Sequence, residues 1–369
     1  MKFIYLTAIL LLLSSSLSAN AKFAKNKECK KCHPLISKEY ASSMHFNSTI
    51  YRDPVHKAIW DKHPINKKKG KYKCAKCHIP TADNLSDMMG KGTKGMPDPD
   101  NETHNEAVAC AFCHRIDSVE HGVMSHKNIV SKKEKHFYGN IKDALKNDFH
   151  TSSSTNENFK NGNMCIGCHS HKKNKAKLDV CVTDVSNKRD TNNCISCHMP
   201  KVKGSISSER KTKEHTFHGF PGASSNQDML SKHIKLGFSK NDNGFEVMVD
   251  NQSPHALMLH PLRLTQLRVD IEIDGKIYRL KPKVFLRVIG KDGKPTPPWL
   301  ATEVVKDTMI KGDEKRLVKY DQALKEGDKV HVMLGYFLVN PKALKKLGME
   351  NLESVKKFNV LKKETYIIK

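Results

Sequence analysis

The sequence predicts a mainly α-helical front part with long loops, followed by an all-β sandwich of immunoglobulin type. Residues 22–231 are polar, rich in Lys, Asn and Ser, and contain little long apolar periodicity. Beyond residue 232, several segments alternate apolar and polar side chains, as strands with one buried face do. All 11 cysteines lie in the front part. A stretch rich in Gly, Pro and Ser at 219–227 precedes the boundary and predicts a linker.

Ten of the cysteines form five copies of one unit, in which two cysteines three positions apart are followed directly by a histidine. This C-x-x-C-H unit is the attachment signature of c-type haem. The thiols add to the two vinyl groups of one porphyrin, and the histidine supplies an imidazole nitrogen to the iron as its proximal ligand. The sequence therefore predicts five covalently attached haems c, bound by Cys29, Cys32 and His33; Cys74, Cys77 and His78; Cys110, Cys113 and His114; Cys165, Cys168 and His169; and Cys194, Cys197 and His198.

Other uses of paired cysteines do not explain the repeated histidine. Zinc sites, redox thiol pairs and disulfides also use C-x-x-C, but none of them requires a histidine directly after the second cysteine. Given 20 histidines in 369 residues, five such histidines by chance have a probability on the order of one in a million. Cys181 is left over. The sequence leaves open whether it is a buried hydrophobe, a surface thiol, an unusual haem ligand or an intermolecular disulfide partner.

Five haems also explain how the polar front part can fold. A segment of this composition would build a weak hydrophobic core by itself. The front part has about 40 residues per haem, too few to enclose each haem in a separate apolar shell. We therefore expect short helices and long loops wrapped around closely packed haems that serve as the core.

The back part, residues 232–369, contains no haem motif, and several of its segments show a strand pattern. Short strands joined by tight turns favour a sandwich of immunoglobulin type. Asp-Gly pairs at 274–275 and 292–293 predict hairpin turns. Apolar residues alternate at 245–249, 267–273, 284–288 and 330–336, and short helices are expected at 341–347 and 350–358.

The N-terminus predicts export to the periplasm. Lys2, a short apolar run over 3–13 and a small-residue stretch ending at Ala21 form a signal peptide, with cleavage expected after Ala21. The apolar run is shorter than the ~20 residues that a membrane-spanning helix needs. No other stretch is apolar enough, so the mature chain is expected to have no membrane span.

The net charge limits the partners. The chain carries 64 Lys and Arg against 39 Asp and Glu, a formal charge of +25. Ten haem propionates would reduce the mature protein to about +14. An exported chain without a nucleic-acid-binding motif is not expected to bind nucleic acid. The excess of lysines is interpreted as a solvated surface, or as a field for an acidic redox protein or a small anionic substrate.

Several further segments resemble a known family. They include Ser43-Met44-His45-Phe46-Asn47, Ala107 to Arg115 around the third motif, His150 before the fourth motif, and His215-Thr216-Phe217-His218 after the fifth. These segments resemble the multihaem cytochromes that include hydroxylamine oxidoreductase and its tetrahaem electron acceptor. Asn251 to His255, with Arg263 downstream, is similar to the first strand of a C-terminal sandwich in some members, although Met258-Leu259-His260 replaces their usual Pro-Thr-Gly.

Combined with the motifs, the resemblance implies which histidines are the second axial ligands of the irons. It implies His45, His150, His215 and His255 as distal ligands, with His218 as the alternate for His215. One of His104, His121 and His126 is expected to supply the fifth, and His126 is our choice. His56 and His63 are further candidates. Which distal histidine serves which iron stays open at this point.

Three functions fit the sequence. The first is electron transfer between periplasmic or membrane-bound redox proteins through mostly bis-histidine haems, which needs no catalytic side chain. The second is reduction or oxidation of a small nitrogen or sulfur compound, such as nitrite, hydroxylamine or sulfite, at one haem with an open iron position. The third is a docking role for the sandwich. Electron transfer is the favoured interpretation.

Overall fold

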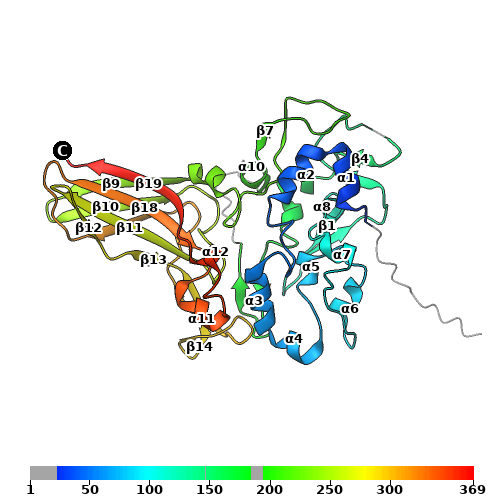
Figure 1. The fold of residues 1–369 in the computed structure, drawn as a ribbon, viewed down its shortest axis with the longest axis horizontal. Helices are drawn as coiled ribbons and strands as arrows, with labels where there is room; N and C mark the ends of the chain where they lie inside the picture. The colour runs from blue at the N-terminus through cyan, green and yellow to red at the C-terminus, as the bar shows by residue number, and fades with distance from the viewer. Residues whose placement is uncertain (1–22, 146, 184–193) are drawn as a thin grey trace, which may run out of the picture.

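The fold has two parts, which follow one another end to end along the long axis of the molecule (Figure 1). A computed structural model describes residues 23–145, 147–183 and 194–369, so the predicted signal peptide lies outside the described residues. Within these ranges, no helix is both long and apolar enough to cross a membrane.

The front part consists of short helices, small two-stranded sheets and long loops. It is less purely helical than predicted, because its loops also contain paired strands of two to five residues. Such short strands form by pairing with a neighbouring segment, so they leave no readable period in the sequence. The helices are α1 (Asn26–Cys32), α2 (Pro34–Ala41), α3 (Pro54–Lys62), α4 (Pro64–Lys69), α5 (Ala75–His78), α6 (Leu85–Met89), α7 (Glu102–Asn105), α8 (Cys110–Cys113), α9 (Asn158–Asn161), η1 (Asn163–Cys165), α10 (Cys194–His198) and η2 (Gln227–His233).

The strands of the front part form four pairs. Strand β3 runs parallel to β4, and the other three pairs are antiparallel. The pairs are β1 (Ile116–Glu120) with β2 (Lys127–Val130), β3 (His136–Tyr138) with β4 (Thr151–Ser153), β5 (Lys172–Lys173) with β6 (Asp179–Cys181), and β7 (Lys201–Lys203) with β8 (Glu214–Thr216).

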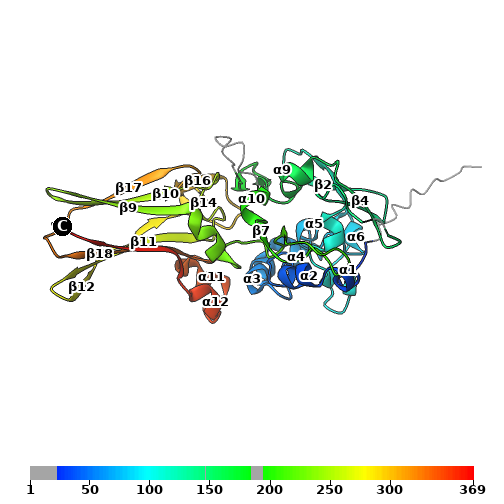
Figure 2. The ribbon, with the colours of Figure 1, turned by 90° about the horizontal axis from the view of Figure 1, so that it is seen from above.

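The back part is built from strands, as the alternating pattern predicted. One sheet has the order β17-β10-β9, a second the order β12-β11-β18-β19 with β13 also paired to β11, and a third the order β15-β14-β16. The first two sheets form facing layers (Figure 2). The strands are β9 (Ile234–Asn241), β10 (Gly244–Asn251), β11 (Leu264–Ile273), β12 (Lys276–Arg279), β13 (Lys283–Phe285), β14 (Arg287–Lys291), β15 (Lys294–Pro295), β16 (Glu303–Asp307), β17 (Lys315–Tyr320), β18 (Lys329–Phe337) and β19 (Asn359–Ile367). The immunoglobulin type stays a prediction.

Both Asp-Gly hairpin turns are confirmed. Asp274 and Gly275 have φ of 48° and 75°, and Asp292 and Gly293 have 51° and 70°. Two successive positive φ values match the right-handed twist of the flanking strands, and Asp and Gly tolerate them best.

The end of the chain differs from the prediction. The first expected helix begins with the 3-10 helix η3 (Pro341–Ala343) and continues in α11 (Leu344–Leu347). The second, expected over 350–358, is only α12 (Glu353–Lys356), and the chain then closes with β19 beside β18. Segment 359–367 forms a strand because it pairs with β18. This short, polar segment does not indicate a strand by itself.

Apolar burial differs strongly between the parts. In the back part, apolar side chains of β9, β10, β11, β17, β18 and β19 form one continuous core. The described residues of the front part bury only two small clusters, one around Trp60 and Tyr72 and one around Phe112 and Phe159. The front part therefore has little ordinary core, as its composition predicted.

The two parts also share an apolar contact. Val339, Met349 and Val355 of the back part are fully buried and pack with Val55 and Ile59 of α3. Helices α3 and α11 accordingly lie next to each other in both views (Figures 1 and 2). The Tyr336 hydroxyl adds a hydrogen bond of 2.6 Å to the carbonyl of Ala223, before η2.

Leu267, at the centre of β11, should contribute strongly to the stability of the back part. Its side chain is fully buried in the shared core. Leu267→Ala should lower the free energy of unfolding by about 2–5 kcal/mol. The matched change Ile277→Ala, on an exposed position of β12, should cost less than about 1 kcal/mol. Native-state hydrogen exchange of the β11 and β18 amides measures both, and equal effects would contradict the core described here.

Candidate functional site

Each C-x-x-C-H unit forms a single helical turn. The backbone N–H of the histidine donates to the carbonyl of the first cysteine, at 2.8–3.0 Å in the first four units. The fifth unit is itself the helix α10. Residues at i, i+3 and i+4 share one face of a helical turn. The two thiols and the imidazole of each unit can therefore meet one porphyrin, and none of the eleven cysteines, all of which are described, is in a disulfide.

Backbone carbonyls orient four of the five proximal histidines. A carbonyl oxygen only accepts, so each Nδ1 must donate its proton and Nε2 is left free to bind a metal. The bonds run from His33 to Ile206 at 2.7 Å, from His78 to Ser48 at 3.0 Å, from His114 to Tyr138 at 2.7 Å, and from His198 to Pro221 at 2.6 Å.

Four proximal histidines face a second histidine across a gap of one iron. Two imidazoles that bind one iron at about 2 Å each place their ring centroids about 6 Å apart. The ring spacings in this structure match that value, so these residues fit a haem iron held between two imidazoles. The centroids are 6.4 Å apart for His33 and His150, 6.2 Å for His114 and His218, 5.9 Å for His169 and His45, and 6.2 Å for His198 and His255.

Burial keeps three of the buried histidine rings in the neutral, metal-binding form. It lowers the pKa of His45, His78 and His218 to about 3, with smaller contributions from neighbouring histidines. The rings are therefore unprotonated at neutral pH.

A loop of the back part carries His255 to the front part. The Asn251 side chain and the Ser253 hydroxyl both donate to the His255 carbonyl, at 2.9 Å each. Gly312 lies against this loop so closely that a Cβ there would be 2.5 Å from the carbonyl of Pro254. The loop between β10 and β11 is thus held by these side-chain hydrogen bonds and by close packing on Gly312, and His255 lies opposite His198 with an angle of 16° between the rings.

Glu39 of α2 decides between the two neighbouring histidines His215 and His218. One carboxylate oxygen accepts from Nε2 of the buried His215 at 2.7 Å, and the other accepts the backbone N–H of His218 at 3.0 Å. His218 then turns its ring toward His114, with Nδ1 held by Thr216 at 2.7 Å. The sequence ranked His215 first, but the structure brings His218 opposite a proximal ring. No local signal marks the choice, because Glu39 is 176 residues away.

His78 has a different neighbourhood. Its ring contact among the described residues is with His56, at only 4.0 Å, which is too short for an iron between the rings. Both rings direct Nδ1 at the same Ser48 carbonyl, at 3.0 Å each, so His56 lies behind His78. Nε2 of His56 is 3.3 Å from the Tyr72 hydroxyl. In the described part of the chain, no second histidine faces His78 at the spacing found for the other four.

The five units also contact one another through their cysteines. The thiols of Cys29 and Cys110 are close enough to shift each other's pKa, as are those of Cys77 and Cys168, and of Cys165 and Cys194. Cys113 interacts electrostatically with both Cys165 and Cys168. The fourth unit therefore lies next to the second, third and fifth, and the first lies next to the third.

Two other predicted ligands lie away from the proximal rings. His126 forms a cluster with His121 and His171 at centroid distances of 4.5 and 4.7 Å. The ring of His63 packs between Trp60 and Trp299. Among the described residues, neither histidine has a ring contact with a proximal histidine.

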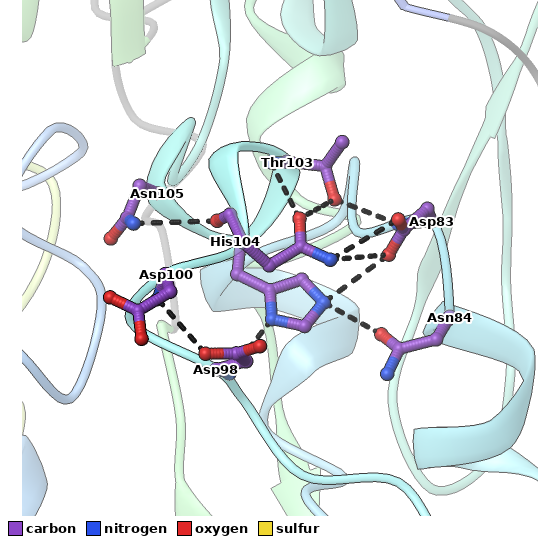
Figure 3. A network of polar contacts seen from close by, with 8 residues as sticks. Asp83, Asn84, Asp98, Asp100, Thr103, His104 and Asn105 are labelled. Carbon is purple, nitrogen blue, oxygen red and sulfur yellow. Dashed lines mark hydrogen bonds and ion pairs between the residues drawn. The ribbon is translucent and has the colours of Figure 1, made fainter.

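His104 is engaged on both ring nitrogens (Figure 3). Nδ1 accepts the backbone N–H of Asp98 at 2.8 Å, and Nε2 lies 2.8 Å from the Asn84 side-chain oxygen. The side chain is buried. These bonds occupy the atoms that a metal would need, so the geometry is that of a structural histidine.

Comparisons with known proteins agree with this site. Residues 28–115 match the family model described as cytochrome c554 and c-prime. The fold is similar to the crystal structure of a penta-heme cytochrome c552 from Thermochromatium tepidum, with 21% sequence identity and a TM-score of 0.71 over 94% of this chain and 99% of that chain. None of the curated proteins compared matches the chain significantly. Together with the five motifs, these findings support a multihaem c-type cytochrome.

Replacing His104 should affect stability and leave the haem sites unchanged. His104→Ala leaves the Asp98 N–H and the Asn84 side chain without their partner. We expect a loss of about 1–3 kcal/mol in the free energy of unfolding of the holoprotein, measured in urea. The electron paramagnetic resonance spectrum should match that of the wild type, and the loss of one low-spin signal would instead make His104 a ligand.

Proposed function

We propose that the chain is an exported, periplasmic cytochrome with five covalently attached haems, which transfers electrons between periplasmic or membrane-bound redox proteins. The observation that carries the proposal is the proximity of the five C-x-x-C-H units, with helices α1 and α8 in contact and thiols of neighbouring units interacting in pairs. Each haem, when bound, supplies an iron that takes up and releases one electron. The residues then place these groups side by side, as stepwise transfer requires.

The connections form a branched chain. The unit ending in His33 touches that of His114, and the unit ending in His169 touches those of His78 and His198. Cys113 links the two groups through its interactions with Cys165 and Cys168. We infer that the unit ending in His169 is the branch point, with ends at His33 in the front part and at His78 and His198 near the back part.

We assign the distal ligands from the ring spacings. His150 serves the iron of His33, His218 that of His114, His45 that of His169, and His255 that of His198. Two imidazoles saturate an iron and leave no position for a substrate, which suits an electron carrier. In this assignment His215 positions His218 through Glu39, and the back part completes one haem site through His255.

The two neighbouring histidines give a matched pair of variants. His218→Ala should remove one low-spin ferric signal and create one high-spin signal, since the His114 iron loses its second imidazole. His215→Gln keeps a donor for Glu39 and should leave all low-spin signals in place. Electron paramagnetic resonance of the purified holoproteins measures both, with pyridine haemochrome as the control for five haems. The reverse pattern would return the ligand role to His215.

A second candidate function arises at His78. The ring behind it is His56, and no described histidine faces it at the spacing of a bis-histidine iron. An iron held there by one imidazole has a position for a small nitrogen or sulfur compound, so this unit is the place where a reductase or oxidase activity would reside.

Ligand titration tests the second candidate. The oxidised holoprotein should show one high-spin signal that changes on addition of hydroxylamine or nitrite, because a vacant position binds them. His56→Ala should keep this response, since His56 lies behind the proximal ring. Five low-spin signals without any response to either compound would leave electron transfer as the sole proposal.

A further inference from the structure

Three cationic side chains gather around Cys181, where the back part meets the front part. Strand pairing places Lys172 of β5 directly opposite Cys181 of β6. The Lys172 ammonium is 3.6 Å from the Cys77 thiol, which belongs to the unit of His78. Arg263 and Arg287 come from the back part, and both interact electrostatically with Cys181. The Arg287 guanidinium is fixed by a hydrogen bond of 2.9 Å to the carbonyl of Asp179.

No described carboxylate forms an ion pair or hydrogen bond with any of the three cations. Asp179 is occupied by Lys173, at 2.6 Å. Asp53 accepts the backbone N–H groups of Val55 and His56 at the start of α3. Tyr336, Cys181 and Asp53 all raise the pKa of Arg263, but only the Asp53 carboxylate is ionised at neutral pH, and it forms no ion pair with Arg263. Among the described residues, these three cations have one carboxylate nearby, that of Asp53, and so form a local excess of positive charge.

The surroundings exclude much of the solvent. The side chain of Asn174, just after β5, donates to the carbonyls of Pro298 and Ala301 at 2.8 and 2.7 Å. Nearby, Trp299 of the same loop packs on His63, with ring centroids 4.9 Å apart. Burial lowers the pKa of Arg263 and raises that of the Cys181 thiol. A desolvated guanidinium is costly unless an anion accompanies it.

We propose that Lys172, Arg263 and Arg287 form an oxyanion-binding site beside the haem that Cys74, Cys77 and His78 would hold. Guanidinium groups bind carboxylates and small inorganic oxyanions through paired, charge-assisted hydrogen bonds, and an ammonium adds a point charge. Two sources share this chemistry, namely a propionate of a bound haem and a free oxyanion such as nitrite or sulfite. The inference rests on the haem site at His78 that is part of the proposed function.

The test uses the full-length holoprotein with its five haems verified. Nitrite binding is measured by isothermal titration calorimetry for the wild type, Arg263→Gln, Arg263→Lys and Arg279→Gln. If the site takes a free oxyanion, Arg263→Gln should weaken nitrite binding by about tenfold or more, since a charge-assisted hydrogen bond is lost. Arg263→Lys should retain most of the affinity. Arg279 is exposed on β12, so its variant should bind like the wild type.

Equilibrium redox titration of the same proteins identifies the other source. If a propionate occupies the site, the wild type shows no nitrite heat, and Arg263→Gln lowers the midpoint potential of one haem. The potential falls because removal of a positive charge favours the oxidised, more positive state of the iron. Neither measurement depends on electron exchange with a partner, so a failure of the proposed electron-transfer function would be seen separately.

The proposal is overturned if Arg263→Gln keeps its haems, binds nitrite like the wild type and leaves all five potentials unchanged. If that variant does not fold, Arg287→Gln and Lys172→Gln take its place in both measurements. If both of these variants match the wild type in nitrite affinity and in all five midpoint potentials, the proposal is likewise overturned.

Discussion

The helical turn of each C-x-x-C-H unit is the constraint on which the rest of the front part depends. One backbone hydrogen bond, from the histidine N–H to the first cysteine carbonyl, brings two thiols and an imidazole to one face. A second bond, from Nδ1 to a distant carbonyl, fixes the tautomer and the ring direction for four of the five units. Ile206 is far from His33 in the sequence, and Pro221 belongs to a later loop than His198. These two hydrogen bonds therefore also hold separate loops together.

The back part is linked to this arrangement as well as having a core of its own. Its apolar layers fold by ordinary burial, yet the loop before β11 presents His255 to the front part. Arg263 follows on the same connection, and the loop at Trp299 packs on His63. One connection of the back part thus reaches both the His198 unit and the surroundings of the His78 unit. This gives the back part a role in the redox site under the proposed assignment.

Two kinds of group meet in and around the front part, the facing histidine rings and the cations near Cys181. Burial lowers the pKa of His45 and His218, two of the rings that face a proximal histidine, which keeps them neutral and suits metal binding. The cations near Cys181 are also enclosed, but they lack a carboxylate partner among the described residues. The His78 unit differs from the other four in its ring contact with His56 and in the Lys172 ammonium beside Cys77.

The sequence by itself determined the five C-x-x-C-H units, the strand-rich back part and its two Asp-Gly turns, because each depends on residues a few positions apart. Through the family resemblance, it also predicted His45, His150 and His255 as distal haem ligands. Only the tertiary structure shows that His218, and not His215, lies opposite a proximal histidine. It also places His126 and His56 where neither faces a proximal ring at the spacing of one iron. These outcomes depend on Glu39, on Ser48 and on a hairpin cluster, each brought close by folding. Histidines in similar local sequences differ only in which residues the fold places opposite them. A pattern over a few neighbouring residues carries no information about that.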